Sequence, residues 1–308
     1  MEERKLYESV EDWLVHYKKT SVKPATYDRL KRSLITMGQY PISGVAVEDL
    51  TSRDIQDYIN ELVDSGYALT TIKKQFHLLS EYISYENLMG TIARPLHKGV
   101  KLPSESTVKK RKKDVIAYTP EEQRRLSNVL MTGESPAYFV AILMMETGLR
   151  IGEALALTWD DIDWNRRALS VNKTVVRLGD SKNSYVQRGA KSFTSNRVIP
   201  LSRNACLMLR DLRERDRSLR GYVFHRENGD YLTYETVRWN IQKACARADV
   251  PYYGQHVFRH TFATNCYNKG CDVKVLSKFL GHADVTVTSN VYIHLFGDAL
   301  EEMRSIVG

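Results

Sequence analysis

The sequence lacks long apolar runs. None of its segments approaches the length of a membrane span, although the chain has 308 residues. The first residues, MEERKLYESVEDW, are charged and contain no apolar stretch, so they do not resemble a secretory signal. We therefore expect a cytoplasmic protein.

Cysteine is scarce. All four cysteines lie in the C-terminal part, at Cys206, Cys245, Cys266 and Cys271, and none belongs to a CxxC pair. Structural zinc sites commonly use such pairs, so the sequence predicts no metal site. In a cytosolic protein these cysteines are expected to be reduced thiols.

Acidic residues are outnumbered. The chain has 45 Lys and Arg against 37 Asp and Glu, a net charge of +8 and a pI of about 9.1. This excess favours a polyanionic partner, because each basic side chain laid against a phosphate releases counterions. The net charge alone does not exclude that the basic excess serves only to keep the protein soluble. With 43% hydrophobic and 27% charged residues, the chain is typical of a globular protein, and its length suits two domains.

Residues 1–101 predict a small helical domain. Apolar residues recur at helical spacing in segments 9–17, 23–37, 52–62 and 70–88. Thr51, followed three residues later by Asp54, predicts a capped start for the third helix. We interpret the apolar stripes as the core of this domain.

Residues 102–115 have no hydrophobic period and predict an interdomain linker. They include five consecutive basic residues, Lys109, Lys110, Arg111, Lys112 and Lys113. Two interpretations stay open. The run is either a solvated or localisation-like patch, or a strap that lies along DNA.

Residues 116–308 predict a mostly helical domain with one small antiparallel sheet. A capped helix is expected from Thr119, where Pro120 and Glu122 follow. Further helices are expected at 137–146, 204–217, 234–248, 256–268 and 273–280. Strand-like runs occur at 168–178, 184–191 and 197–201, and we expect the last two to form a hairpin. The predicted fold class is therefore mainly α with a small antiparallel β-sheet.

Two segments carry arginines suited to phosphodiester chemistry. Breaking DNA without a metal requires fixed guanidinium groups, a nucleophile and a general acid. Arg150 ends the turn TGLR, and Glu153 follows three residues later, although an ordinary salt bridge is the alternative. His256 and Arg259 share a helical face. A metal site at His256 and His260 is disfavoured, because no Glu follows the first His and Arg259 would repel a cation.

Two later residues become candidate site residues only when they are considered together with these two segments. His282 ends the motif LGH, and Tyr292 lies in NVYIHL. Taken singly, they would be a surface histidine and a core tyrosine.

Together these segments resemble the tyrosine recombinase, or phage integrase, family. The matching text is TGLRIGEALALTWDDID, GAKSFTSNRVIPL, HVFRHTFAT, LGH and NVYIHL, in this order. It covers the predicted catalytic domain, and residues 1–101 are similar to the family's SAM-like core-binding domain. The resemblance implies a site-specific DNA recombinase that acts through a 3′-phosphotyrosine and a Holliday junction, with no metal, ATP or other cofactor.

The resemblance also implies roles for the matching residues. Two arginines would clamp the phosphate, a lysine would protonate the leaving 5′ oxygen, and histidines would assist proton transfer and bind the phosphate. The tyrosine would be the nucleophile, and Glu153 would support the site. Lys182 is a rival for the lysine, but the text after Lys191 matches the family's hairpin. The implied catalytic set is Arg150, Lys191, His256, Arg259, His282 and Tyr292.

Exchange of both strands implies a homotetramer on double-stranded DNA, with a directionality factor as a further partner. The tail, residues 295–308, is expected to pack on its own domain or on a neighbouring protomer. Within the family, the text favours a mobile-element integrase over an Xer-like chromosome or plasmid dimer resolvase. A type IB topoisomerase is a weaker alternative, because the HxxR, LGH and Tyr motifs and the short tail argue against it. A non-catalytic DNA-binding protein is also weaker, since the whole motif set is present.

Overall fold

The computed structural model describes residues 4–108, 116–179, 183–189, 196–216 and 220–281. The chain divides into two compact units, one built mainly from residues up to 113 and the other mainly from residues after it. Each unit has its own hydrophobic core. The predicted fold class, mainly α with a small antiparallel sheet, is confirmed. Within the described ranges, no helix has both the length and the apolar character to cross a membrane.

The N-terminal unit is helical, as predicted. Thr51 accepts a hydrogen bond from the backbone N–H of Asp54, and the Asp54 carboxylate accepts one from the backbone of Thr51, which completes the expected capping box. The helices bury their apolar faces against one another, with Leu34, Ile59 and Leu79 in the shared core. They are α1 (Leu6–Trp13), a π-helical turn (Leu14–Lys18), α2 (Lys19–Ser21), α3 (Pro24–Met37), α4 (Ser52–Asp64) and α5 (Leu69–Met89). Short 3₁₀ turns occur at Pro41–Gly44, Val47–Asp49 and Leu96–Gly99.

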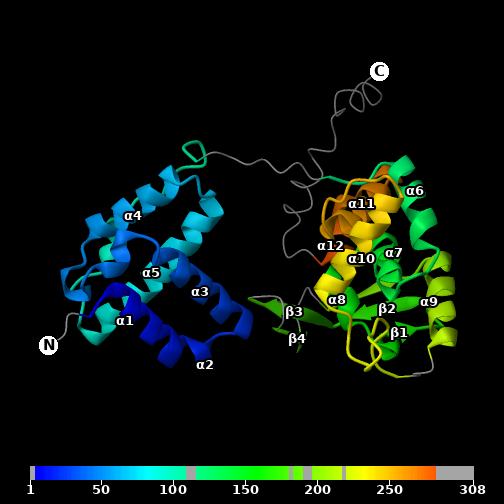
Figure 1. Cartoon of the computed structure of the whole chain (residues 1–308), viewed down its shortest axis with the longest axis horizontal. Helices are drawn as coiled ribbons and strands as arrows, with labels where there is room; N and C mark the ends of the chain where they lie inside the picture. The colour runs from blue at the N-terminus through cyan, green and yellow to red at the C-terminus, as the bar shows by residue number, and fades with distance from the viewer. Residues whose placement is uncertain (1–3, 109–115, 180–182, 190–195, 217–219, 282–308) are drawn as a thin grey trace, which may run out of the picture. The chain divides into compact units, whose positions relative to one another are not determined.

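The second unit is organised around one apolar helix, α7. Apolar side chains occur on all its sides, as expected for a helix surrounded by others. Helices α6, α8, α9, α10 and α11 all pack against it (Figure 1). The helices of this unit are α6 (Pro120–Leu130), α7 (Pro136–Thr147), α8 (Ile151–Ala156), α9 (Arg203–Arg215), α10 (Tyr234–Arg247), α11 (His256–Asn268) and α12 (Val273–Leu280). A 3₁₀ turn lies at Trp159–Asp161.

Two small sheets accompany these helices. Strands β1 (Ile162–Asp163), β2 (Ala168–Val171) and β5 (Arg197–Pro200) form an antiparallel sheet in the order β1-β2-β5. Strand β3 (Lys173–Leu178) pairs with β4 (Asn183–Arg188).

The predicted strand partners are wrong in two respects. The run 168–178 is two strands, and Asn172 between them donates its side-chain amide to Asp161 instead of continuing the ladder. Among the described residues, β4 pairs with β3 rather than with β5, so the expected hairpin of 184–191 with 197–201 does not form. Strand β5 pairs with β2 instead, because this register buries Leu169 and Ile199 together.

Candidate active site

The turn between α7 and α8 requires glycine at position 148. Gly148 adopts a left-handed conformation, with φ of 66°, and its N–H donates to the carbonyl of Met144. A Cβ atom there would lie 2.5 Å from Phe262 Cδ1 and 2.9 Å from Leu280 Cδ2. The turn therefore delivers Arg150 to the start of α8 while it packs tightly against α11 and α12.

Glu153 fixes Arg150 in two ways. The backbone N–H of Arg150 donates to Glu153 Oε2 at 2.8 Å, and its Nη1 donates to Oε1 at 3.0 Å. Arg150 precedes the helix as its N-cap, and the predicted proximity of these two residues follows from this capping box. Glu153 therefore binds Arg150 through both of its carboxylate oxygens, and its supporting role stays a prediction.

Arg197, for which the sequence predicted no role, binds the same carboxylate. From β5 its Nη1 and Nη2 donate to Glu153 Oε1 and Oε2 at 3.0 and 2.7 Å, a bidentate pair. Both side chains are almost fully buried. Arg197 lies in the segment SNRVIPL, which is part of the sequence that resembles the tyrosine recombinase family. Its signal in the sequence was a lone guanidinium at the start of an otherwise apolar strand, where a buried charge needs a partner.

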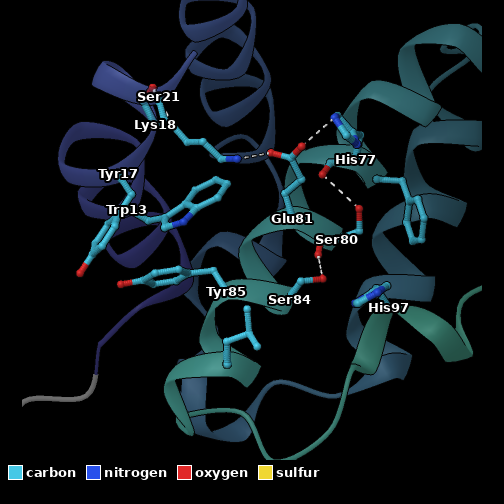
Figure 2. Close-up of a pocket in the computed structure, with 12 residues that line it drawn as sticks. Trp13, Tyr17, Lys18, Ser21, His77, Ser80, Glu81, Ser84, Tyr85 and His97 are labelled. Carbon is cyan, nitrogen blue, oxygen red and sulfur yellow. Dashed lines mark hydrogen bonds and ion pairs between the residues drawn. The ribbon is translucent and has the colours of Figure 1, made fainter.

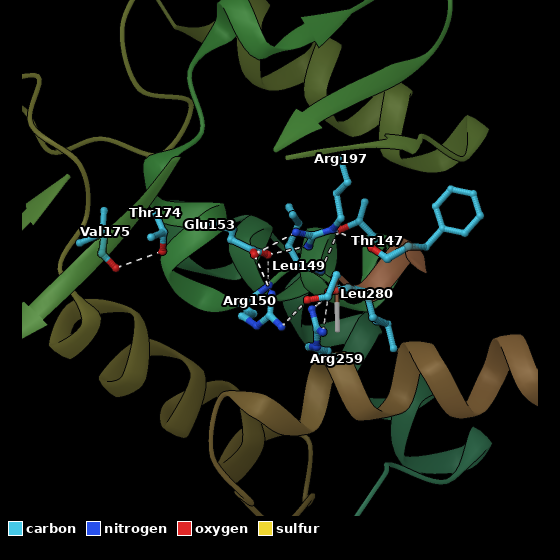
Figure 3. A network of polar contacts seen from close by, with 12 residues as sticks. Thr147, Leu149, Arg150, Glu153, Thr174, Val175, Arg197, Arg259 and Leu280 are labelled. Carbon is cyan, nitrogen blue, oxygen red and sulfur yellow. Dashed lines mark hydrogen bonds and ion pairs between the residues drawn. The ribbon is translucent and has the colours of Figure 1, made fainter. Parts of the chain in front are cut away.

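The end of α12 binds three arginines through consecutive backbone carbonyls. Arg197 Nε donates to Phe279 O at 2.7 Å, Arg259 Nη2 to Leu280 O at 2.7 Å, and Arg150 Nη2 to Gly281 O at 3.1 Å. Figure 3 shows the three guanidinium groups gathered around Glu153 and Leu280. The last carbonyls of a helix lack intrahelical partners and carry its negative dipole end, so they suit cations. We call Arg150, Arg197 and Arg259, with Glu153, the arginine cluster.

The arginine cluster is positively charged overall. Burial alone would raise the pKa of Glu153, but the hydrogen bonds and charge of Arg197, then the charge of Arg150, hold that pKa below its ordinary value of 4.5. The Glu153 carboxylate is bound by two of the three guanidinium groups, those of Arg150 and Arg197. Arg259 is buried and also donates to Gly148 O at 2.8 Å, whereas the side chain of Arg150 is 36% exposed. Arg150 is thus the cluster member with an open side for an anion.

The two histidines of α11 are neutral near pH 7. His256 keeps an exposed side, yet partial burial of its ring, then the charges of Arg259 and Arg150, lowers its pKa below 6.5. Burial, then His256 and Arg259, lowers the pKa of His260 to about 4. Within the described parts of the chain, no group of three or more His, Cys, Asp or Glu side chains could hold a metal ion.

The remaining predicted site residues lie outside the described residues. These are Lys191 and its rival Lys182, His282, Tyr292, the basic run Lys109, Lys110, Arg111, Lys112 and Lys113, and the tail 295–308. Arg150, Glu153, His256 and Arg259 are described. The arginine cluster unites three of these four, and the charges of its arginines act on the fourth, His256.

The N-terminal unit carries an unrelated hollow of about 630 Å³ (Figure 2). Aromatic rings of Trp13, Tyr17 and Tyr85 line it, together with Glu81, which pairs with Lys18 at 2.8 Å. None of the predicted catalytic residues that the structure describes lines this hollow, so the candidate active site is the arginine cluster.

The family model described as "Phage integrase family" matches residues 117–298, more than half of the chain. The chain belongs to the phage integrase family. The prediction made from the motifs is confirmed, and with it the enzyme class, a tyrosine-type DNA strand transferase.

Individual relatives agree with this assignment. A "tyrosine recombinase XerC-like" protein of Caldanaerobacter subterraneus is 28% identical over 306 residues, covering 92% of this chain and 77% of the relative. The transposase of transposon Tn916 from Enterococcus faecalis is 23% identical over 290 residues, covering 85% of this chain and 67% of the relative. The fold is similar to that of the Tn1549 transposon integrase, solved with transposon right end DNA. The TM-score is 0.78 at 18% identity, with 99% and 100% of the chains covered.

Gly148→Ala tests the tight turn at the site. We expect a loss of about 1–2 kcal/mol from the left-handed backbone alone, and about 1–3 kcal/mol more from the clash with Phe262 and Leu280. Gly229→Ala is the matched control, because Gly229 has φ of 83° but nothing within 4 Å of an added Cβ. Chemical denaturation of both variants measures the difference. Equal losses of unfolding free energy in the two variants would show that the close packing of Gly148 against Phe262 and Leu280 does not add to the cost of the substitution.

Glu153→Gln tests the buried carboxylate. Because the folded pKa of Glu153 is lowered, its stabilisation is fully present above its unfolded value of 4.5 and is lost as pH falls through the folded pKa. We expect Glu153→Gln to cost about 3–5 kcal/mol at pH 7, since buried arginines lose their counter-charge. The difference from wild type should shrink below pH 4.5.

Glu121→Gln is the control for this experiment. Glu121 also pairs with an arginine, Arg124, but on an exposed face of α6. Its replacement should change the free energy of unfolding little, because solvent screens the pair. A Glu153→Gln penalty that is small, or constant from pH 7 to pH 3, would contradict the assigned role of the carboxylate.

Proposed function

We propose that this enzyme cleaves and rejoins double-stranded DNA at specific sites, with Tyr292 as nucleophile, for the integration and excision of a mobile element. The observation that carries the proposal is the arginine cluster, in which Arg150 keeps an open side beside two further guanidinium groups. A scissile phosphodiester gains negative charge in its transition state. Preorganised guanidinium groups stabilise that charge without having to reorganise.

The proposed reaction has balanced steps. The phenolic oxygen of Tyr292 attacks the phosphorus atom while His256 accepts its proton, and a 3′-phosphotyrosine forms as the bond to the 5′ oxygen breaks. Lys191 gives that oxygen its proton, while Arg150 and Arg259 bind the non-bridging oxygens and His282 donates a hydrogen bond to them. The phosphotyrosine keeps the energy of the broken bond, so religation needs no nucleotide.

His256 suits proton transfer in this scheme. A group that relays protons at neutral pH must be able to accept one, and the lowered pKa of His256 keeps its ring neutral. Its position near Arg150 and Arg259 supports a role at the same phosphate. Glu153 acts through the arginines and does not react.

The assembly we propose follows from the chemistry. Two strand exchanges through a four-way junction require four cleavages, and each protomer supplies one nucleophile, so four protomers act together. A directionality factor is proposed as an additional partner. Residues 1–101 would form the core-binding domain, 102–115 the basic linker and 116–308 the catalytic domain, and the tail 295–308 would dock in cis or on a neighbour.

The runner-up function is an Xer-like resolvase of chromosome or plasmid dimers. The XerC-like relative supports it, with the highest identity of the relatives described above. The Tn916 transposase and the fold of the Tn1549 integrase support the mobile-element function. Sequencing the junctions that the enzyme makes in its host distinguishes them: element ends favour an integrase, and a single chromosomal site favours a resolvase.

Tyr292→Phe tests the nucleophile. The substitution removes only the phenolic oxygen, so we expect no covalent complex on a nicked suicide substrate, while DNA binding stays within a few-fold of wild type. Gel electrophoresis under denaturing conditions measures the covalent complex. Tyr253→Phe is the control, because Tyr253 is an exposed tyrosine of the same unit and should leave trapping unchanged. A Tyr292→Phe variant that still forms the adduct would refute the assignment.

Replacing the basic run, residues 109–113, with Gln and Ser tests the linker. If these residues bind phosphates, DNA affinity should weaken alike for cognate and non-cognate duplexes, because phosphates carry no base information. The slope of log K against log salt should fall by about 0.9 for each phosphate that the variant no longer neutralises. Binding isotherms at several salt concentrations measure it. An unchanged slope would mean that the run is only a solvated connection.

A further inference from the structure

The end of α11 brings two cysteines together. The N–H of Cys271 donates to Cys266 O at 3.0 Å, and the N–H of Gly270 donates to Tyr267 O at 2.7 Å. With Gly270 left-handed at φ of 80°, these two bonds form a Schellman motif. In this motif the residues at the positions of Cys266 and Cys271 frequently make an apolar side-chain contact.

The surroundings agree with that contact. Both cysteines are free thiols, partly buried, and both pack against the small core of Ala263, Leu276 and Leu280. Burial, and then a charge on Cys271, raises the pKa of Cys266. Cys206 and Cys245 belong to the other, larger core of this unit.

We propose that Cys266 and Cys271 form an oxidisable dithiol site that a peroxide converts reversibly into an intramolecular disulfide. Both thiols are partly buried, and the Cys271 sulfur, which contacts Asp272 O at 3.7 Å, attacks first. Its thiolate takes one peroxide oxygen to become a sulfenic acid, and the other oxygen leaves as hydroxide, which is protonated to water. The Cys266 thiol then attacks that sulfur, the disulfide forms, and a second water leaves. An external dithiol returns both thiols.

The site is coupled to the arginine cluster through α12. Cys271 directly precedes Asp272, whose carboxylate accepts from the backbone N–H groups of Lys274 and Val275 and so fixes the start of the helix. The other end of this eight-residue helix supplies the carbonyls that bind three arginines at 2.7–3.1 Å. Bonding the sulfur atoms draws Cys271 towards α11. The oxidised enzyme therefore cleaves DNA more slowly, a consequence that rests on the proposed function.

Peptide mapping by mass spectrometry tests the disulfide in the full chain. After treatment with hydrogen peroxide, we expect a peptide linking Cys266 to Cys271 that has two hydrogen atoms fewer and is restored by dithiothreitol. Cys266→Ser should leave Cys271 as a sulfenic acid that a dimedone probe traps, and Cys206→Ser should leave the linkage intact. Absence of the linkage, or pairing with another cysteine, would overturn the site.

Single-turnover cleavage tests the coupling. Oxidised wild type should cleave at least several-fold more slowly than the reduced enzyme while binding DNA equally well, with recovery after reduction. Cys271→Ser should be insensitive to peroxide. A disulfide that forms without changing the rate would overturn the coupling. A reduced wild type that never cleaves would instead count against the proposed function, because the mapping result does not depend on activity.

Discussion

The site depends on one electrostatic constraint: three guanidinium groups must lie close together without unfolding the protein. The Glu153 carboxylate binds two of them, Arg150 and Arg197, and these two arginines hold the pKa of Glu153 below its ordinary value. Three carbonyls at the end of α12 and the carbonyl of Gly148 supply further acceptors. Because this compensation is partial, the cluster stays positive, and that residual charge is what makes it a site for an anion.

The same constraint explains why the second unit is built as it is. The cluster collects side chains from the start of α8, from β5 and from α11, and backbone from α12, which are far apart in the sequence. Gly148 lets the α7–α8 turn approach Phe262 and Leu280 closely enough for Arg259 to reach its carbonyl. The apolar helix α7 gives these elements a common surface to pack on.

Much of this was predictable from the sequence, for identifiable reasons. Amphipathic spacing and caps located the helices, since they are local signals, and Arg150, Glu153 and Arg259 stood out as charges in recognisable motifs. Strand pairing was not predictable, because the alternation of apolar and polar residues indicates a strand but not the strand with which it pairs. Arg197 was missed because its role depends on a bidentate contact with a residue 44 positions away. The role of the α12 carbonyls could not be predicted, because every residue has a backbone carbonyl and the sequence does not show which of them bind arginines.

A double-mutant cycle between Arg150→Lys and Glu153→Gln tests most directly whether Glu153 acts by positioning Arg150. Single-turnover cleavage is measured with saturating DNA, at a temperature where all four proteins are folded. Since misplacing a catalytic group by about 1 Å costs on the order of 10²-fold, Glu153→Gln should slow wild type strongly. It should add almost nothing in the R150K background. Rate losses that simply multiply in the double variant would contradict the account, because the two residues would then act independently.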